Sequence, residues 1–479
     1  MAASSSSSSL NFTVRRCQPQ LVPPAIPTPH AFKPLSDIDD QDGLRFHTPM
    51  IQIYKKQASM VEKDPVQVIR QALSQTLVFY YPFAGRLIEG PNRKLMVDCT
   101  GEGAMFVEAD ADVTLHQFGD SLQPPFPCFH ELLYDVPGTQ QITNTPLLLV
   151  QLTLEKVSGS KMLELVEYGI KMQVTRLQCG AFILAIGLNH TICDAPGYKQ
   201  FMSAWAEMAR GATKPSIAPV WRRDLLIARD PPRITCNHRE FDQVQHTLPS
   251  SDENLVQRSF FFGPLDIAAL RRLIPQHQHC TTFDLITACL WRCRTKALQI
   301  ETDEDVSMMC IVNGRGRFNP PLPVGYYGNA FAYPATVTTA GKLCRKPFGY
   351  AVELINKVKG EMTEEYLQSV ADLMVMKGRC LFTTVRSCIV SSLARFNLRE
   401  VDFGWGEAVY GGVAQAGAGR FLGVSYFCSA KNGKGEEGII FPIWLPAEAM
   451  ERFAEEFNLM LGNKNQPQTR SATFIMSTL

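Results

Sequence analysis

The chain of 479 residues is 45% hydrophobic and 19% charged, with 47 basic and 46 acidic residues and a formal net charge of +1. This balance gives no overall field that would attract nucleic acid or an anionic membrane surface. No apolar run reaches the ~18 residues that a membrane span needs, and the length predicts two domains.

The 14 cysteines lack a disulfide-like rhythm, which favours a reducing compartment. Cys289 and Cys293 lie one helical turn apart without a paired set of ligands, so we predict no metal site. The serine-rich start resembles a plastid transit segment only faintly, and the C-terminal Ser477-Thr478-Leu479 lacks the basic middle position of a peroxisomal signal. We therefore expect a cytoplasmic protein.

The first elements are expected in residues 64–108. Asp64 is predicted to cap a helix that has Pro65 at its first position. The apolar face of this helix is predicted to be Val66, Ile69, Leu73 and Leu77. Residues 95–99 and 104–108 are predicted to form a strand pair joined by the glycine-containing segment 100–103.

An irregular stretch follows the next predicted strand, at residues 147–154. Residues 150–153 are echoed by residues 173–177, and the segment between them has no strong pattern. We interpret residues 152–172 as an insertion that splits or duplicates a strand, in the form of a surface loop, a short helix or a translated non-coding segment.

An apolar run at 182–189 ends at His190, and Asp194 and a Pro-Gly turn follow. Phe201, Trp205 and Met208 then recur at helical spacing. A buried strand is therefore predicted to deliver His190 to a strand-to-helix corner. Burial would hold the imidazole neutral near pH 7, so that it can take a proton from an alcohol, a thiol or an amine. Asp194 either orients the histidine or caps the helix, and local geometry favours the cap.

The second half alternates strands and helices in the same way, so the chain is predicted to be α/β with two lobes of similar size. We place the first lobe at 1–210, a linker at 211–233 and the second lobe at 234–479. Thr281 and Asp284 are predicted to form a capping box. Residues 433–438 match a dinucleotide-binding pattern but lie between two predicted strands, so they are interpreted as a hairpin turn.

Two further clusters are candidates for function. Residues 313–317 offer the cations Arg315 and Arg317, which can pair with Asp194 across the two lobes or meet a phosphate. In the segment 402–406 two glycines flank Trp405, so the backbone can bend around a large ring. This segment either lines a pocket or forms a packed turn.

These residues carry a resemblance to a known family. The sequences His190-Thr191-Ile192-Cys193-Asp194 and Asp402-Phe403-Gly404-Trp405-Gly406, each placed near the end of one half, resemble the paired signature motifs of the plant BAHD acyltransferases. Residues 81–87, 95–103, 281–294 and 313–323 also resemble that family, so the match covers nearly the whole chain. The most similar subgroup is that of the alcohol acyltransferases, which includes benzyl alcohol O-benzoyltransferases.

The resemblance implies two chloramphenicol-acetyltransferase-like lobes with a solvent tunnel between them. Acyl-CoA is then the co-substrate, no cofactor is bound permanently, and the protein is a monomer without nucleic-acid or membrane partners. His190 removes the proton of an alcohol acceptor, which attacks the thioester, and an ester and free CoA are released. Thr282 is a candidate contact for acyl-CoA.

The resemblance also assigns supporting roles. Asp194 pairs with an arginine, for which Arg315 is the candidate and Arg317 the alternative. Asp402, Gly404, Trp405 and Gly406 support the structure and the CoA site, and Trp405 is a candidate border of the site.

Three departures from the family pattern leave alternatives open. Ala195 stands where the family has glycine, which the subgroup tolerates. Residues 391–399 lack a threonine expected near an oxyanion-stabilising position, and the insertion at 152–172 can displace His190 if it does not loop out. The insertion and the missing threonine make a non-catalytic member that binds acyl-CoA or a partner one alternative. An N-acyltransferase, which would use the same base, is the other. The acyl donor and the alcohol are not specified by the sequence.

Overall fold

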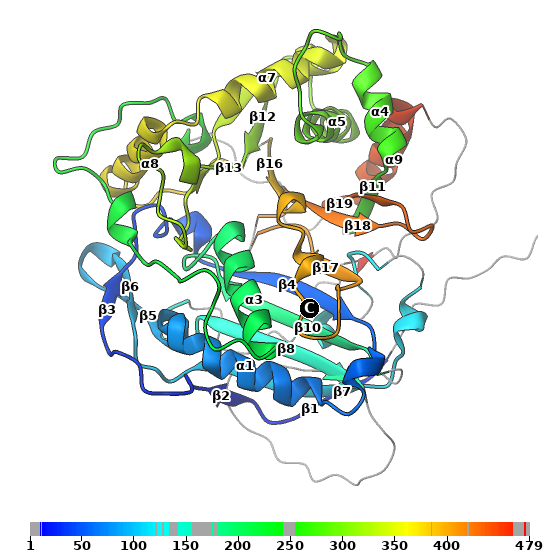
Figure 1. Ribbon diagram of the computed structural model, residues 1–479. Helices are drawn as coiled ribbons and strands as arrows, with labels where there is room; N and C mark the ends of the chain where they lie inside the picture. Colours follow the sequence, from blue (N-terminus) through cyan, green and yellow to red (C-terminus); the bar gives the residue numbers. More distant parts are fainter. Residues whose placement is uncertain are drawn as a thin grey trace, which may run out of the picture.

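The computed structural model describes residues 10, 12–119, 122–126, 129–133, 142–155, 175–176, 180–242, 254–384, 386–418, 421–462 and 474–475. It contains an eight-stranded sheet, formed mainly by the first half, and a seven-stranded sheet formed by the second half. Figure 1 shows the two sheets as two lobes, with the first below and the second above. The predicted α/β class with two lobes is confirmed.

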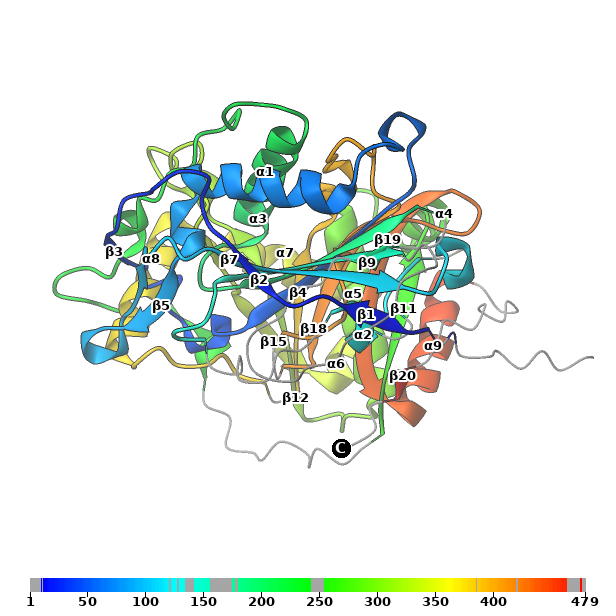
Figure 2. The same ribbon diagram turned by 90° about the horizontal axis from the view of Figure 1, so that it is seen from below.

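The first sheet has the strand order β1-β7-β8-β10-β4-β17, with β2 and β9 beside that path. Its strands are β1 (Val14–Arg16), β2 (Gln20–Val22), β4 (His47–Tyr54), β7 (Ala104–Ala111), β8 (Leu148–Glu155), β9 (Thr175–Arg176), β10 (Phe182–Asn189) and β17 (Tyr410–Val413). The helices α1 (Pro65–Phe79) and α3 (Ala195–Ala209) pack against each other and cover one face of the sheet (Figure 2).

Strand β10 is the predicted buried strand that leads to the histidine. All eight of its residues are buried, and it pairs with β4 along its full length, from Phe182 opposite Tyr54 to Asn189 opposite His47. An uninterrupted apolar run fits this position because the strand is covered on both faces of the sheet. The end of β10 is therefore fixed by its neighbours.

The proposed insertion lies mostly outside the described residues, but its two flanks are described. Strand β8 pairs with β10 up to Leu152, which lies opposite Leu184. Beyond that point Thr175 of β9 lies opposite Ile183. Strands β8 and β9 thus both lie between β10 and β7, at successive positions along these two strands. Strand β10 itself is continuous, so the segment between β8 and β9 does not displace His190 from the end of β10.

The predicted pairing of residues 95–99 with 104–108 is wrong, although both segments are strands. Strand β6 (Leu95–Asp98) lies between β3 (Phe32–Pro34) and β5 (Arg86–Glu89) in a three-stranded sheet, whereas β7 belongs to the eight-stranded sheet. Gly101 and Gly103 adopt positive φ values of 72° and 107° between the two strands. A Cβ at Gly103 would stand 2.3 Å from the Val22 carbonyl oxygen. The glycines therefore carry the chain from one sheet to another rather than closing a hairpin.

The second sheet has the strand order β15-β12-β16-β18-β19-β11-β20. Its strands are β11 (Leu255–Phe262), β12 (Asp305–Cys310), β15 (Ala335–Thr339), β16 (Ser387–Ser392), β18 (Val424–Lys431), β19 (Glu437–Pro446) and β20 (Phe474–Ile475). The remaining helices are α2 (Phe129–Leu132), α4 (Pro264–Arg272), α5 (Thr282–Ala297), α6 (Ala340–Arg345), α7 (Phe348–Gly360), α8 (Glu364–Met376) and α9 (Ala447–Leu461). A separate strand pair joins β13 (Val312–Asn313) to β14 (Phe331–Ala332).

Three local predictions are confirmed. The Asp64 side chain accepts a hydrogen bond from the Val66 amide at 3.1 Å at the start of α1. Thr281 and Asp284 form the capping box of α5. Residues 433–438 lie at the turn between the antiparallel strands β18 and β19, so no nucleotide-binding helix follows them.

The second half of the sequence contributes a strand to the first sheet. Strand β17, from the second half, pairs with β4 at the edge of the first sheet, with Tyr410 opposite Ile53. One hydrophobic core contains Leu184 of the first sheet together with Tyr426 of the second. The lobe boundaries at 210 and 233 stay a prediction. A division of the sequence at these residues leaves β17 of the second half in the first sheet.

Candidate active site

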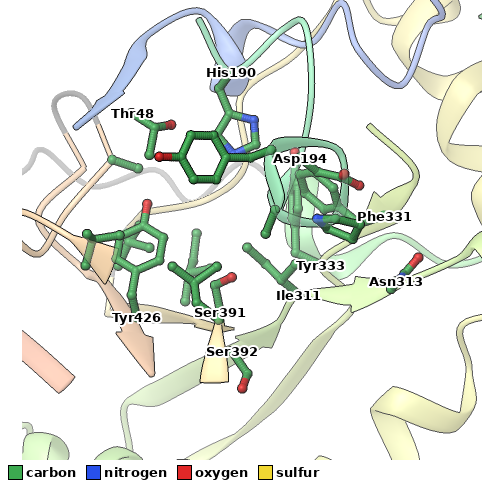
Figure 3. Close-up of a pocket in the computed structure, with 18 of the residues that line it drawn as sticks. Thr48, His190, Asp194, Ile311, Asn313, Phe331, Tyr333, Ser391, Ser392 and Tyr426 are labelled. Carbon is green, nitrogen blue, oxygen red and sulfur yellow. The ribbon is translucent and has the colours of Figure 1, made fainter. Parts of the chain in front are cut away.

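A cavity of about 370 Å³ lies between the two sheets. Its walls include Thr48 of β4, His190 after β10, Phe331 of β14 and Ser391 of β16. Figure 3 shows His190 on one side of this cavity, with Ser391 and Tyr426 on the other. Both lobes therefore contribute side chains to one space.

His190 occupies the corner between β10 and α3. Its backbone amide donates to the Phe46 carbonyl at 2.9 Å, and its ring packs against Phe46 and Phe331 with centroid distances of 5.3 and 5.9 Å. The Asn189 side chain accepts from the amide and the hydroxyl of Thr191 at 3.1 and 2.7 Å. These contacts fix the turn that carries the imidazole.

The two nitrogens of the His190 ring have different surroundings. Nδ1 is buried and has no hydrogen-bond partner within the described ranges. Nε2 likewise has no partner there, but it is not a buried atom, so it is open to the cavity. Burial lowers the pKa of His190 below the ordinary value of 6.5, and its own carbonyl, Asp194 and Asn329 offset this effect in part. The imidazole is thus neutral at pH 7, with an accessible nitrogen.

Asp194 makes a two-point ion pair with Arg315, with both oxygen–nitrogen distances at 2.7 Å. Its carboxylate also accepts from the Gly197 amide, where it caps α3, and from the Ala330 amide, each at 3.1 Å. The pair is 5% exposed at Asp194 and 18% at Arg315. Asp194 therefore joins the corner of the first lobe to the 313–330 segment of the second, and its hydrogen bonds do not include the histidine ring.

A second buried network supports the same corner, and the sequence pattern did not point to it. The Asn329 amide group donates to the His190 carbonyl at 2.8 Å and to the Asp39 carboxylate at 2.9 Å. Arg223 donates to Asp39 at 3.3 Å and to the Ile192 carbonyl at 2.7 Å. The available signal was the segment 36–41, in which five of six residues are polar and all six are buried in the structure.

The segment 402–406 forms a closed turn away from the cavity. The Asp402 carboxylate accepts from the amides of Gly404 and Gly406, both at 2.7 Å, and these glycines have φ values of 110° and 80°. The Trp405 ring meets Phe182 edge-on at 5.2 Å. Phe182 begins β10 and His190 follows its end, which are ~26 Å apart along a strand. None of these motif residues lines the cavity.

Thr282, the candidate contact for acyl-CoA, is the first residue of α5 and is half-buried. It does not line the cavity, but the next residue, Phe283, does, as does Lys359. Arg317 and Arg395 are exposed residues of the same lining. Lys359 pairs with Asp284, whereas no described carboxylate pairs with either arginine. The lining therefore includes basic side chains, and two of them have no described carboxylate partner.

The sequence pattern did not indicate the cavity wall opposite His190. Strands β16 and β18 are parallel neighbours, with Ser391 beside Tyr426, and both side chains line the cavity. Neither hydroxyl has a hydrogen-bond partner in the part of the chain that the structure describes. The expected threonine is absent, but Ser391 presents a hydroxyl to the cavity in that segment.

The described residues contain neither a metal-binding cluster nor a helix that could span a membrane. No three His, Cys, Asp or Glu side chains gather there in a way that could hold a metal ion. Cys289 and Cys293 lie in the buried interior of α5 with their sulfur atoms 4.0 Å apart. No described helix combines the length and the apolar character that crossing a membrane requires.

The two sheets and the cavity between them form the two-lobed architecture that the resemblance to the acyltransferases implies. A family model described as the Transferase family matches residues 12–162 and 167–460. Benzyl alcohol O-benzoyltransferase of Nicotiana tabacum is 58% identical over 464 residues, which are 96% of each chain. The enzyme of that name from Petunia hybrida is 56% identical over 99% of this chain and 100% of its own. The chain belongs to the Transferase family, and the resemblance to the BAHD acyltransferases is confirmed.

Solved structures agree on the fold. Vinorine synthase has a TM-score of 0.65 at 21% identity, over 92% of this chain and 96% of that chain. TRI101 of F. sporotrichioides, complexed with Coenzyme A and T-2, has a TM-score of 0.65 at 15% identity, over 89% and 97%. At these identities the likeness shows the two-lobed architecture.

Proposed function

We propose that this chain, an O-acyltransferase, forms esters from acyl-CoA and an alcohol with His190 as the general base. The observation that carries the proposal is the His190 Nε2 atom, which is unpaired and open to a cavity shared by both lobes. Relatives over nearly the full length are benzyl alcohol O-benzoyltransferases and alcohol acyl transferases, which supports an alcohol as the acceptor.

The reaction needs one proton acceptor and one place for negative charge. Nε2 of neutral His190 takes the proton of the alcohol as its oxygen attacks the thioester carbonyl carbon, so a carbon–oxygen bond forms and the carbonyl oxygen becomes an oxyanion. The carbon–sulfur bond then breaks, and the imidazolium returns the proton to the leaving thiolate. The products are an ester and free CoA, and the histidine is neutral again.

The oxyanion needs a hydrogen-bond donor from another part of the cavity. The unpaired hydroxyl of Ser391 faces His190 from the opposite lobe (Figure 3). It is a candidate for the role for which a threonine was expected. A donor placed at an oxyanion contributes ~10²–10³-fold in rate.

The basic residues of the cavity lining suit the phosphate groups of acyl-CoA. They are Arg317, Lys359 and Arg395. Guanidinium and ammonium groups bind phosphate through charge-assisted hydrogen bonds. We place the CoA entrance beside these basic residues, with Thr282 as a contact beside Phe283, and the thioester next to His190. Acyl-CoA is consumed as a co-substrate in this scheme.

Substitution of the histidine tests the proposal. His190→Ala should lower CoA release from benzoyl-CoA and a panel of alcohols by ~10²–10⁴-fold, because a general base contributes this much. The exposed His116→Ala is the matched control and should keep wild-type turnover. Thiol release is measured for both, with circular dichroism to verify folding. Full turnover in His190→Ala would reject the proposal.

The same assay addresses the alternatives that the sequence left open. CoA binding without release for every donor and acceptor would favour a non-catalytic binding protein, and turnover with amines alone would favour an N-acyltransferase. The continuous strand β10 and the open Nε2 atom of His190 favour catalysis. A cytoplasmic location and a monomeric state also remain proposals.

A further inference from the structure

Residues from two parallel strands, taken alternately along each, form the cavity wall opposite His190. Ile389 and Ser391 of β16 lie beside Val424 and Tyr426 of β18, and all four line the cavity. Val390, between the first two, points to the core of the second lobe instead. Because successive side chains in a strand alternate between faces, the Ser391 and Tyr426 hydroxyls belong to one surface.

The Tyr426 hydroxyl differs from those of the other tyrosines in the lining. The Tyr333 hydroxyl donates to the Gln41 side chain at 2.5 Å, and the Tyr198 hydroxyl is closed off from the cavity. Tyr426 is 7% exposed, and its hydroxyl has no described partner and is open to the cavity. Figure 3 shows its ring reaching toward the side of the cavity where His190 lies.

The surroundings of Tyr426 are apolar. The cavity lining includes Leu44, Met50, Phe382, Val413 and Ala418, which belong to the same hydrophobic core as Tyr426. Burial raises the pKa of the Tyr426 hydroxyl, so it is a neutral hydrogen-bond donor at physiological pH. A wholly apolar substrate displaces water here and leaves the hydroxyl unpaired, which weakens binding.

We propose that Tyr426 is a specificity-determining residue. Its hydroxyl binds a hydroxyl or amino substituent on the ring of a substrate that occupies the apolar part of the cavity beside it. The enzyme then favours aromatic substrates with such a substituent over the unsubstituted ones. A site built to hydrogen-bond a substrate group discriminates against the analogue without it. The inference rests on the proposed acyl transfer, and the substituent belongs to either the acyl group or the alcohol.

Two substrate series test the inference and distinguish these two sources. In the first, benzoyl-CoA is paired with benzyl alcohol or its ring-hydroxylated forms. In the second, benzyl alcohol is paired with benzoyl-CoA or ring-hydroxylated benzoyl-CoA. The ratio of kcat/KM, substituted to unsubstituted, is measured from the ester formed. In one series we expect a wild-type ratio of about 10 that falls to about 1 in Tyr426→Phe, a change of about 1.4 kcal/mol.

Tyr333→Phe is the matched control, because its hydroxyl is already engaged with Gln41, and its ratio should equal that of the wild type. A wild-type ratio below 1 in both series would overturn the inference even if Tyr426→Phe failed to fold. A uniform loss of activity on all substrates in Tyr426→Phe would also overturn it, and would assign the hydroxyl to the reacting centre. Absence of wild-type turnover with every pair would reject the proposed function itself, whereas turnover with unchanged ratios would reject only this inference.

Discussion

At the scale of single residues, burial gives His190 its chemistry. An exposed histidine titrates near pH 6.5 and is partly charged under mildly acidic conditions. The His190 ring is packed between Phe46 and Phe331, and this desolvation disfavours the imidazolium. The base is therefore ready to accept a proton without first losing one.

The pH dependence of the reaction follows from this shift. Because burial lowers the pKa of His190 in the folded protein, protonation of the free enzyme should reduce kcat/KM only below pH 6.5. Initial rates from pH 5 to 8, with a stability check at each pH, measure this acid limb. An acid limb centred above pH 6.5 would contradict the prediction, since it would require stabilisation of the imidazolium.

The sequence predicted those site residues whose position depends on the neighbouring stretch of chain. An apolar run ending in a histidine is visible in the chain, and the structure places His190 at the cavity. The residues at 313–317 offered Arg315 and Arg317 as partners of Asp194, and the choice of Arg315, which the structure shows, came from the family resemblance. Ser391 and Tyr426 could not be found in this way, because they share a wall only through the parallel pairing of β16 with β18.

At the scale of elements, one link between the lobes is an ion pair between two turns. The Asp194–Arg315 pair joins the first turn of α3 to the loop after β13, and Arg315 also donates to the Gly328 carbonyl at 2.6 Å. Removal of one partner leaves a mostly buried charge without compensation, which is far more costly than loss of an exposed pair.

Asp194→Asn should therefore lower the free energy of unfolding by about 3 kcal/mol, as typical for a broken buried pair. The exposed pair of Arg258 and Glu451 provides the control Glu451→Gln, for which we expect a loss below about 1 kcal/mol. Denaturant titrations measure both. A normal stability in Asp194→Asn with a reduced rate would show that Asp194 acts in the chemistry instead.

The turn at 402–406 should behave as a structural element. In Gly404→Ala the residue keeps a φ of 110°, and its new methyl group would lie 2.9 Å from the Met60 methyl group. Strain at such a position costs ~1–3 kcal/mol. Gly406→Ala has a φ of 80° and open space around the added carbon, so its melting temperature should fall less. The fraction of each variant that stays folded should keep its activity, and equal melting temperatures would contradict the assignment.

The wrong strand pairing at 95–108 shows why elements are easier to predict than their partners. Both strands form where the apolar alternation indicates. They separate into two sheets because each has other partners: β3 pairs with β6 in one sheet, and β1 pairs with β7 in the other. Such long-range pairing is not encoded in the spacing of nearby residues, and the same holds for β17 in the first sheet.

At the scale of the whole molecule, the two halves of the sequence are not two independent folding units. Strand β17 closes the edge of the first sheet beside β4, and Phe403, from the second half, packs its ring against Tyr54 and Trp205 of the first. A chain ending near residue 210 would lack these contacts and would expose the edge of β4. Unpaired edges and uncovered apolar faces favour aggregation over a stable fold.

A cut in the exposed segment 211–214 tests this organisation. A protease site introduced there should allow cleavage while the two pieces stay together, because the sheet pairing, the Asp194–Arg315 pair and the shared core hold them. Size-exclusion chromatography and thiol release before and after cleavage measure association and activity, and both should persist. The fragment 1–210 expressed alone should aggregate or lack a cooperative melting transition. A soluble fragment with a sharp transition would instead establish the first half as a domain in its own right, with β17 an accessory to it.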